Sequence, residues 1–378
     1  MSTSRRDFLK QATTASMVAA APSAFGASII SKKGESEADW LLNESDTVIG
    51  HGDYKYKVEK NWAKISPTHT PLLNCHEMVQ DSKGRLIMIG DHPQNNVLIF
   101  DKSGKLLDFW GTSFPGGHGL TLHDEGGEDL LYIADSGWQM GKYGQMENYN
   151  GRVSKTTIDG KILFDIGHPM QIGVYKPDEP FRPTETAIGP NGDIYVADGY
   201  GMSRIIQYDA NGRYIRHWGG KDNPDPNYKL VSAHGVAIDY RDKENPMVVC
   251  TSRVQNCFKY FTLNGKYIKT IQMPNMSVCR AVFDEDNLYS GVCWSQPKEG
   301  KTNWKDHTGF ITIMEGDKVV SNPGGTQPVY KNGELQKTFQ LPNKPILHGH
   351  DVCVDNDKNL YVCQWNANHS APYKLTRV

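Results

Sequence analysis

The stretch from residue 184 to residue 219 reads TETAIGPNGDIYVADGYGMSRIIQYDANGRYIRHWG and decides the fold. Apolar and polar residues alternate in four short runs, which is the pattern of half-buried β-strands. The turn Gly189-Pro190-Asn191-Gly192 joins the first two runs, and Ala210-Asn211-Gly212 joins the last two. Because such turns between alternating runs indicate β-hairpins, we expect a four-stranded antiparallel unit here.

The same pattern recurs along the chain. Three further units span residues 77–111, 119–167 and 235–271, a divergent unit begins near Cys279, and the last begins at His350. The last unit lacks a fourth strand. The segment Tyr54–Ile65 precedes the first unit and would supply that strand, which favours a closed ring over an open solenoid. No unit has helical periodicity. We therefore predict an all-β fold, a six-bladed β-propeller of NHL-type four-stranded blades that spans residues 54–378.

Three histidines open the first strands of alternate units, namely His118, His234 and His350. Their separations are equal, since 234 − 118 = 116 and 350 − 234 = 116. If each interval holds two units, these side chains converge on the axis from every second blade. Three imidazoles with open coordination positions suit Zn²⁺ or another divalent transition metal. For each histidine alone, the alternative is a structural role. His76 opens the first blade and His348 precedes His350 by two residues, so both are additional candidates.

Tyr200 and Arg253 follow the second strands of their blades, at the edge where the first strands begin. The long insertions 136–151 and 294–308 and the link 168–183 belong to the same face. Extra chain on one rim is typical of a binding face, here for a small-molecule or peptide substrate. Tyr200 suits a general base or hydrogen-bond donor, and Arg253 suits a carboxylate. The alternatives are a tyrosine that covers the rim, a salt bridge between blades and neutral surface variation.

The N-terminus has the features of an export signal. Ser4-Arg5-Arg6-Asp7-Phe8-Leu9-Lys10 resembles a twin-arginine motif, and it precedes an apolar stretch, 12–21, and small residues at 24–26. We expect a signal peptide over residues 1–26, an N-terminal extension over 27–53 and export to the periplasm by the twin-arginine machinery. The apolar stretch is too short to span a bilayer, so no stable membrane insertion is expected. A formal net charge of −2 without a long Lys/Arg run argues against nucleic acid.

The seven cysteines leave two possibilities open. In an oxidising compartment, Cys250 with Cys257 and Cys353 with Cys363 are candidate disulfides. Alternatively, all are small buried hydrophobic residues. No Cys-x-x-Cys occurs, so we expect no thiolate metal site. The chain also lacks a phosphate-binding loop, a Gly-x-Ser-x-Gly elbow and a His-Glu-x-x-His motif, which argues against a nucleotide cofactor and a serine hydrolase.

Residues 70 to 378 resemble the peptidyl-α-hydroxyglycine α-amidating lyases. The resemblance implies a six-bladed propeller with a histidine-bound zinc and a structural calcium. It also implies cleavage of an N–C bond at a hydroxylated carbon, with release of an amide and glyoxylate. The matching motifs are Pro183-Thr184-Glu185, Tyr195-Val196-Ala197-Asp198-Gly199-Tyr200, Ser203-Arg204-Ile205, His118-Gly119-Leu120 and His350-Asp351.

Carried over by position, the resemblance implies a role for each candidate residue. The three equally spaced histidines correspond to the zinc ligands, Tyr200 to the catalytic tyrosine and Arg253 to one active-site arginine. Asp351, with the main-chain carbonyls of Leu120 and Met78, corresponds to the calcium site. In this reading the metal acidifies the substrate hydroxyl and the tyrosine accepts its proton.

The chain departs from the family at two places. The second active-site arginine falls on Asp91-His92, and the methionine before the last zinc ligand falls on His348. An acid at position 91 argues against a glycine-derived carboxylate as substrate, whereas metal-dependent lyase chemistry survives the change. The leading hypothesis is therefore an exported metal-dependent lyase. The alternatives are a metal-dependent propeller hydrolase such as a lactonase, and a non-catalytic NHL-repeat scaffold.

Overall fold

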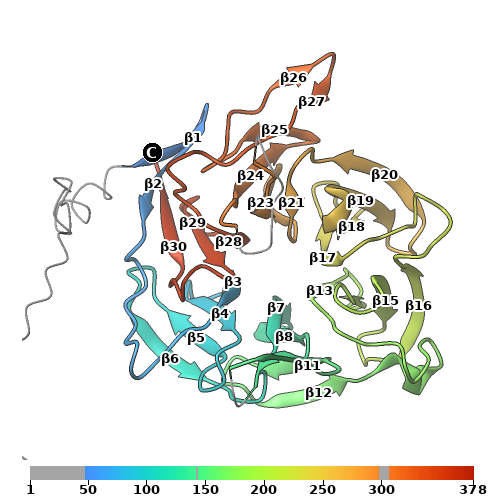
Figure 1. Cartoon of the computed structure of the whole chain (residues 1–378). Helices are drawn as coiled ribbons and strands as arrows, with labels where there is room; N and C mark the ends of the chain where they lie inside the picture. The colour runs from blue at the N-terminus through green and yellow to red at the C-terminus, as the bar shows by residue number, and fades with distance from the viewer. Residues whose placement is uncertain (1–46, 142–143, 298–305) are drawn as a thin grey trace, which may run out of the picture. The chain divides into compact units, whose positions relative to one another are not determined.

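The computed structural model describes residues 47–141, 144–297 and 306–378, and here the chain forms a ring of antiparallel sheets around a central axis (Figure 1). The predicted six-bladed all-β fold is confirmed. The predicted signal peptide lies outside the described residues. No helix in the described part is long and apolar enough to span a membrane. The first three blades contain β3 (Cys75–Gln80), β4 (Leu86–Gly90), β5 (Val97–Phe100) and β6 (Leu106–Trp110); β7 (Gly117–Glu125), β8 (Glu128–Asp135), β11 (Arg152–Thr157) and β12 (Ile162–Ile166); and β13 (Glu185–Ile188), β14 (Ile194–Ala197), β15 (Arg204–Tyr208) and β16 (Tyr214–Gly219).

The remaining blades follow in chain order around the ring. In the fifth blade, two short strands take the place of a continuous first strand, because the pairing is interrupted between them. The sixth blade includes strands from both ends of the described chain. These blades contain β17 (Ala233–Asp239), β18 (Met247–Ser252), β19 (Cys257–Thr262) and β20 (Tyr267–Gln272); β21 (Ser277–Val278), β22 (Val282–Asp284), β23 (Asn287–Trp294), β24 (Phe310–Glu315) and β25 (Lys318–Ser321); and β28 (Gly349–Val354), β29 (Leu360–Gln364), β30 (Tyr373–Arg377), β2 (Tyr54–Glu59) and β1 (Val48–His51).

The ring is closed by an early strand, as the sequence predicted. Strand β2 pairs antiparallel with β30, and Val58 lies opposite Leu375. Strand β1 then pairs with β2 as a fifth strand of this sheet. Because the two ends of the described chain share one sheet, the open solenoid is excluded.

The hairpin turns use glycine where the backbone requires a positive φ. Gly192 and Gly212 have φ values of 83° and 76°, in the left-handed region that glycine adopts without a steric penalty. The Asp209 carboxylate accepts hydrogen bonds of 2.9 Å from the backbone N–H groups of Asn211 and Arg213. The side chain therefore fixes the turn between β15 and β16.

The hydrophobic core lies between neighbouring blades. Strand β4 is entirely buried, whereas most of the outer strand β16 is exposed or half-buried. Ile87 and Ile99 of the first blade pack in one cluster with Leu131 and Ile133 of the second. Burial of apolar area at each such junction is the main stabilising contribution, so every blade depends on its neighbours.

A tryptophan near the end of the fourth strand contacts a turn of the next blade. The Trp110 indole N–H donates to the carbonyl of Ile158 at 2.9 Å. A Cβ added at Gly265 would approach the Trp218 ring to 2.7 Å, so that turn must be glycine. Trp62, which follows β2, donates to the carbonyl of Lys102 at 3.0 Å. The contact repeats where the ring closes, between the sixth blade and the first.

Shorter elements lie in the connections. The insertion between the second and third strands of the second blade carries a hairpin whose side chains reach the central cavity described below. Residues 142–143 and 298–305 of the two predicted insertions lie outside the described residues. The remaining elements are β9 (Trp138–Met140), β10 (Met146–Asn148), η2 (Pro169–Ile172), η3 (Arg253–Gln255), β26 (Tyr330–Lys331) and β27 (Glu334–Leu335).

All seven cysteines are buried and none is in a disulfide. Cys353 lies opposite Tyr361, and Cys363 lies opposite Asp351, so this pair is out of register for a bridge. The interpretation as small buried hydrophobic residues therefore describes the structure, and the two candidate disulfides are absent from it.

Candidate metal centre

Four histidines project from β-bulges at the start of first strands. A bulge inserts a residue without a direct partner and turns its side chain, which aims these imidazoles toward the axis. The histidines are His76, His118, His234 and His350. The register shifts that mark the bulges lie between Cys75 and Glu77, between Gly117 and Gly119, between Ala233 and Val236, and between Gly349 and Asp351.

The three equally spaced histidines form a nearly regular triangle on the axis. Their ring centroids are 4.8 Å apart for His118 and His234, 4.7 Å for His118 and His350, and 5.0 Å for His234 and His350. All three are buried. Imidazoles at this spacing from three blades can share one metal ion, since Zn–N bonds measure about 2 Å.

His76 joins this cluster as a fourth imidazole. Its ring centroid lies 4.8 Å from that of His118 and 4.9 Å from that of His350. Ligand atoms of these three residues all lie within 4.8 Å of one another. The His76 Nε2 atom faces the Asp91 carboxylate at 3.2 Å, which leaves Nδ1 as the ligand atom. A carboxylate behind a ligating imidazole is a common arrangement at metal sites, because it fixes the tautomer.

Backbone carbonyls fix the tautomers of two other histidines. Nδ1 of His118 donates to the carbonyl of Thr184 at 2.7 Å, and Nδ1 of His350 donates to that of His76 at 2.9 Å. Both Nε2 atoms therefore present a lone pair. Nε2 of His350 and Nδ1 of His76 are buried and have no hydrogen-bond partner among the described residues. Because unpartnered buried polar atoms are costly, this donor set fits a divalent transition metal.

The environment keeps these imidazoles neutral. Burial lowers the pKa values of His118, His234 and His350 well below the ordinary value, and neighbouring imidazoles and Arg253 lower them further. Metal coordination requires the neutral ring, so the cluster is already in its ligating form at neutral pH.

Tyr200 and Arg253 complete the polar side of the cluster. The Tyr200 hydroxyl lies 3.1 Å from Nε2 of His118 and 3.2 Å from Nε2 of His234. Arg253 donates to this hydroxyl at 3.4 Å. Burial raises the pKa of Tyr200, while the Arg253 charge acts in the opposite direction. The Tyr200 ring stacks on Trp138, with centroids 4.9 Å apart and an interplanar angle of 21°.

Tyr200, Arg253 and three of the histidines line a cavity of about 660 Å³; the three are His76, His118 and His350. Its wall combines the polar cluster with large apolar side chains, including tryptophan and methionine from the β9–β10 hairpin. Such a combination is typical of sites for small ligands with an apolar part. The apolar side chains include Trp138, Met140, Met146, Trp294 and Trp365.

Two of the additional candidates lie apart from the imidazole cluster. His348 donates through Nδ1 to the carbonyl of Cys293 at 3.0 Å, and its ring packs against Trp294, with centroids 5.7 Å apart. Burial lowers the pKa of His348 to about 4. His92 follows Asp91, and its Nδ1 accepts a hydrogen bond from the backbone of Gln94 at 3.2 Å. Asp91, in contrast, lines the cavity and contacts His76.

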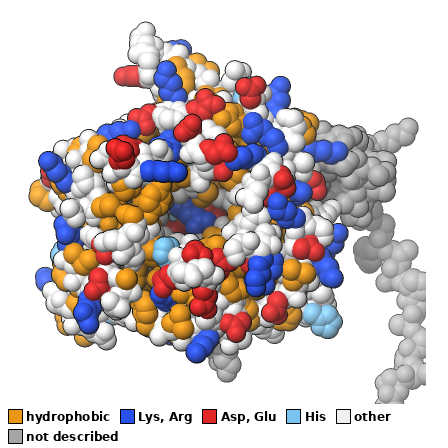
Figure 2. Space-filling model, turned by 180° about the vertical axis from the view of Figure 1, so that it is seen from behind, with side chains coloured by type: hydrophobic (Ala, Val, Ile, Leu, Met, Phe, Trp, Pro, Cys, Tyr) orange, Lys and Arg blue, Asp and Glu red, His pale blue; other side chains and the backbone are white. Residues whose placement is uncertain are grey.

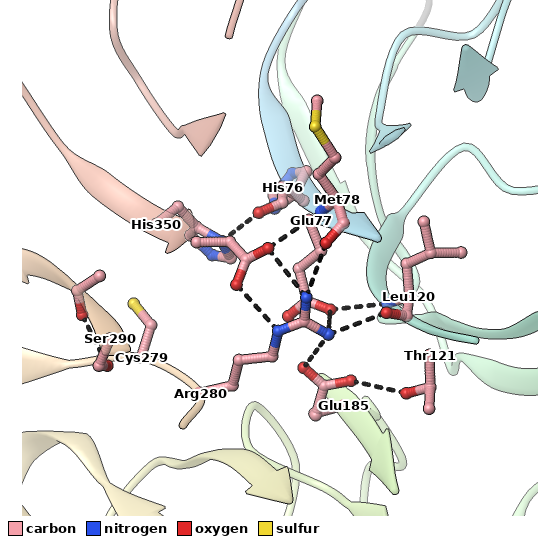
Figure 3. A network of polar contacts seen from close by, with 12 residues as sticks. His76, Glu77, Met78, Leu120, Thr121, Glu185, Cys279, Arg280, Ser290 and His350 are labelled. Atoms are coloured by element: carbon pink, nitrogen blue, oxygen red, sulfur yellow. Dashed lines mark hydrogen bonds and ion pairs between the residues drawn. The ribbon is translucent and has the colours of Figure 1, made fainter. Parts of the chain in front are cut away.

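The groups that the resemblance implies for calcium do converge, but on an arginine (Figure 3). The Arg280 guanidinium donates to the carbonyls of Leu120 and Met78 at 2.9 and 3.0 Å, and to the Asp351 carboxylate at 2.8 and 3.0 Å. With the guanidinium in this position, the three groups do not fit a calcium ion. No motif or repeat position in the sequence marks Arg280.

A thiol also lies near the imidazoles, although the sequence contains no Cys-x-x-Cys. Ligand atoms of Cys279, His234 and His350 lie within 4.8 Å of one another. Burial raises the pKa of the Cys279 thiol well above its ordinary value, so the free group is a neutral thiol. Cys279 stands at the start of the fifth blade, the position that His76 has in the first blade. This equivalence is the feature of the sequence that indicates its place near the imidazoles.

The fold and site define a six-bladed propeller with a histidine cluster on its axis. The chain is 29% identical over 295 residues to peptidyl-alpha-hydroxyglycine alpha-amidating lyase 1 of Drosophila melanogaster, which covers 72% of this chain and 47% of that protein. It is 25% identical over 292 residues to peptidyl-glycine alpha-amidating monooxygenase A of Xenopus laevis, covering 74% of this chain and 27% of the relative. The chain thus spans less than half the length of these two enzymes.

Further likenesses concern the repeat and the propeller fold. Human NHL repeat-containing protein 3 is 24% identical over 244 residues, covering 58% of this chain and 67% of that protein. Among solved structures, a streptogramin B lyase matches with a TM-score of 0.51 at 14% identity, covering 85% of this chain and 97% of the lyase. A gluconolactonase from Xanthomonas campestris matches with a TM-score of 0.52 at 11% identity, covering 86% and 90% of the two chains. No family model matches the chain.

Proposed function

We propose that this protein is a metal-dependent lyase that cleaves an N–C bond at a hydroxylated carbon and releases an amide and an aldehyde. The observation that carries the proposal is the Tyr200 hydroxyl, which lies within 3.2 Å of Nε2 of both His118 and His234 at the wall of an apolar cavity. A divalent metal held by the histidines supplies Lewis acidity toward a substrate hydroxyl. The similarity to amidating lyases supports the same chemistry.

Tyr200 is the candidate for proton transfer. The substrate hydroxyl loses its proton as the C=O bond forms, the N–C bond breaks, and the nitrogen gains a proton to leave as a neutral amide. Tyr200 as phenolate accepts the first proton and, as phenol, delivers one to the nitrogen, so the reaction is balanced. Burial raises the pKa of Tyr200 and Arg253 lowers it. A metal ion held by His118, His234 and His350 would lower the pKa of Tyr200, as the Arg253 charge does, and so would favour the phenolate.

Arg253 is the candidate for binding an anionic group of the substrate. The side chain is buried, donates to the Tyr200 hydroxyl and forms no ion pair with a carboxylate of the described residues. The guanidinium packs over the rings of Tyr200 and Trp294, at 5.5 and 5.1 Å from their centroids. Because a buried cation without an anion is costly, a substrate carboxylate beside Arg253 is favourable.

Asp91 has a different role from the family arginine at its position. One carboxylate oxygen accepts from the Asn74 backbone at 2.9 Å, and the other accepts from the Asn74 side chain at 2.7 Å and faces His76. Both oxygens of the Asp91 carboxylate therefore have partners in the cavity wall, and one of them orients the His76 ring. Among the described residues, Arg253 is the one candidate cation for a substrate carboxylate, so the apolar wall would contribute a larger share of the binding.

The hydrolase alternative is less well supported by the site. Propeller lactonases normally use carboxylate-rich sites, and three buried carboxylates near the axis here contact Arg280 instead. The likeness to the gluconolactonase concerns the fold alone.

We also propose export by the twin-arginine route, which rests on the motif at residues 4–10.

The test is release of glyoxylate from a peptide that ends in α-hydroxyglycine, with an aromatic residue before it to match the apolar wall. The metal-loaded protein should release glyoxylate and amide in equal amounts, and the EDTA-stripped protein should not. A lactone substrate assayed in parallel addresses the hydrolase alternative. Lactone opening without any glyoxylate would overturn the proposal.

A further inference from the structure

The strongest polar contact on the axis, apart from the histidines, is made by a single arginine. Arg280 lies between β21 and β22, where the first strand of the fifth blade is interrupted. Its guanidinium donates four hydrogen bonds of 2.8 to 3.0 Å and forms an ion pair of 3.1 Å with Glu77. The acceptors are both carboxylate oxygens of Asp351, the carbonyls of Leu120 and Met78, and one oxygen of Glu77.

The acceptors around Arg280 are those that a hard divalent cation prefers. The carboxylates of Glu77, Glu185 and Asp351 are each at most 2% exposed, and they come from three different blades. The Glu185 carboxylate lies 3.8 Å from the guanidinium. Carboxylate and backbone carbonyl oxygens together make up the usual ligand set of Ca²⁺. Here the positive charge at their centre belongs to the chain itself.

We propose that the Arg280 guanidinium takes the place of a divalent cation in this ring of oxygens, so that the folded protein needs no calcium at the axis. The planar guanidinium fills the position toward which the oxygens point. An additional cation beside it would meet like charge in a buried setting, which is unfavourable.

Arg280 also acts as a positioning residue for the histidine cluster. Glu77 directly follows His76, and Asp351 directly follows His350. The guanidinium therefore ties two histidine-bearing strands to the fifth blade, one residue beyond each imidazole. A rigid tether at this distance limits the movement of the ligands and keeps them close enough to share an ion.

The guanidinium lies beside a second cavity, away from the one at the histidines. Arg280 lines a cavity of about 540 Å³ that is distinct in its lining from the histidine cavity. On the face shown in Figure 2, the centre is hollowed and Lys or Arg side-chain atoms lie at its floor. Substitution of Arg280 therefore leaves the oxygen ring accessible to ions from solvent.

The experiment measures calcium binding to EDTA-stripped protein by equilibrium dialysis, together with the thermal midpoint with and without millimolar Ca²⁺. The wild type should bind no calcium at the axis, and its midpoint should stay unchanged. Arg280→Ala should have a lower midpoint without calcium, bind about one Ca²⁺ per chain, and regain about 5 °C or more with calcium, since a ligand that binds only the folded state stabilises it. Arg241→Ala is the matched control, because Arg241 pairs with only one buried carboxylate, Asp239. It should lose stability without a calcium response.

Two results would overturn the proposal. One is calcium binding or calcium stabilisation in the wild type equal to that in Arg280→Ala. The other is a folded Arg280→Ala variant that binds no calcium. If Arg280→Ala does not fold, Arg280→Lys serves in its place, since lysine keeps the charge but cannot make five contacts. Arg280→Lys should have a lower thermal midpoint than the wild type and no calcium response. Calcium stabilisation of Arg280→Lys would contradict the proposal. Neither measurement uses lyase activity or a transition metal, so the outcome is independent of the proposed function.

Discussion

Nδ1 of His350 lies 2.9 Å from the main-chain oxygen of His76, so a candidate ligand of the last blade is oriented by a candidate ligand of the first. These two blades are also the ones that the pairing of β2 with β30 brings together. Closure of the ring and assembly of the metal centre are therefore coupled. A change that loosens the closure should weaken metal binding as well as the fold.

Trp62→Ala tests the contribution of the closing junction to the fold. Trp62 is 4% exposed, contacts the rings of Phe100 and Tyr361, and donates to Lys102 across the closing junction. Removal of a buried tryptophan side chain should lower the free energy of unfolding by about 3–5 kcal/mol. Chemical denaturation measures the loss, with Trp62→Phe as the milder control. Equal stability of Trp62→Ala and the wild type would show that the junction contributes nothing to closure.

His76→Gln and Asp91→Asn test the fourth imidazole. If His76 is a ligand that Asp91 orients, each variant should lower the affinity for Zn²⁺ about 10- to 100-fold, as is usual when a partner behind a ligand is lost. Competition with a chromophoric chelator measures the affinity. His92→Gln is the control and should have no effect. If both variants bind zinc like the wild type, His76 is outside the ligand set.

Tyr200→Phe should retain the metal and lose activity. The substitution removes only the hydroxyl beside His118 and His234, so stacking on Trp138 persists while proton transfer is lost. We expect kcat to fall about 10²- to 10⁴-fold, the usual contribution of a general acid or base. Tyr214→Phe, on the exposed outer strand, should be fully active. A Tyr200→Phe variant with wild-type kcat would rule out the proposed proton transfer.

The buried imidazoles predict a specific dependence of stability on pH in the metal-free protein. Their folded pKa values lie well below the unfolded value of about 6.5. Their contribution is therefore fully present above pH 6.5 and is lost as the pH falls below it, because only the unfolded chain takes up protons. Each such histidine costs about 1.4 kcal/mol per pH unit in this range.

Thermal unfolding of EDTA-stripped protein between pH 8 and pH 5 measures this effect. The midpoint should be nearly constant from pH 8 to 7 and should fall below pH 6.5. His234→Gln removes one titrating group and should reduce the slope. A midpoint that rises on acidification would contradict neutral, buried imidazoles.

The sequence was sufficient to predict the ring and the position of its principal histidines. Asn-Gly turns and alternating runs, as in Ile205–Tyr208, depend on local backbone geometry, so they can be recognised without contacts. The spacing of His118, His234 and His350 could be interpreted because repeated units impose the same position on every second blade. The early strand at Tyr54–Glu59 was found for the same reason, since one unit lacked a strand.

The sequence was insufficient where contacts join distant parts of the chain. Arg280 contacts Asp351, Leu120 and Met78, which lie 71, 160 and 202 residues away. Arg280 also belongs to the divergent fifth blade, where no repeat pattern predicts that its side chain points toward the axis. Trp138 lies on an insertion outside the repeated strands, so its stacking on Tyr200 had no signal in the repeat.

The most direct test of the central claim is the metal content of the purified protein and of three variants, His118→Ala, His234→Ala and His350→Ala. Elemental analysis should find about one transition-metal ion per wild-type chain and almost none in each folded variant, since loss of one of three imidazoles removes most of the affinity. Circular dichroism verifies that each variant is folded. A full complement of metal in any one variant, or a wild type that binds no added Zn²⁺, would contradict a metal centre built from these three histidines.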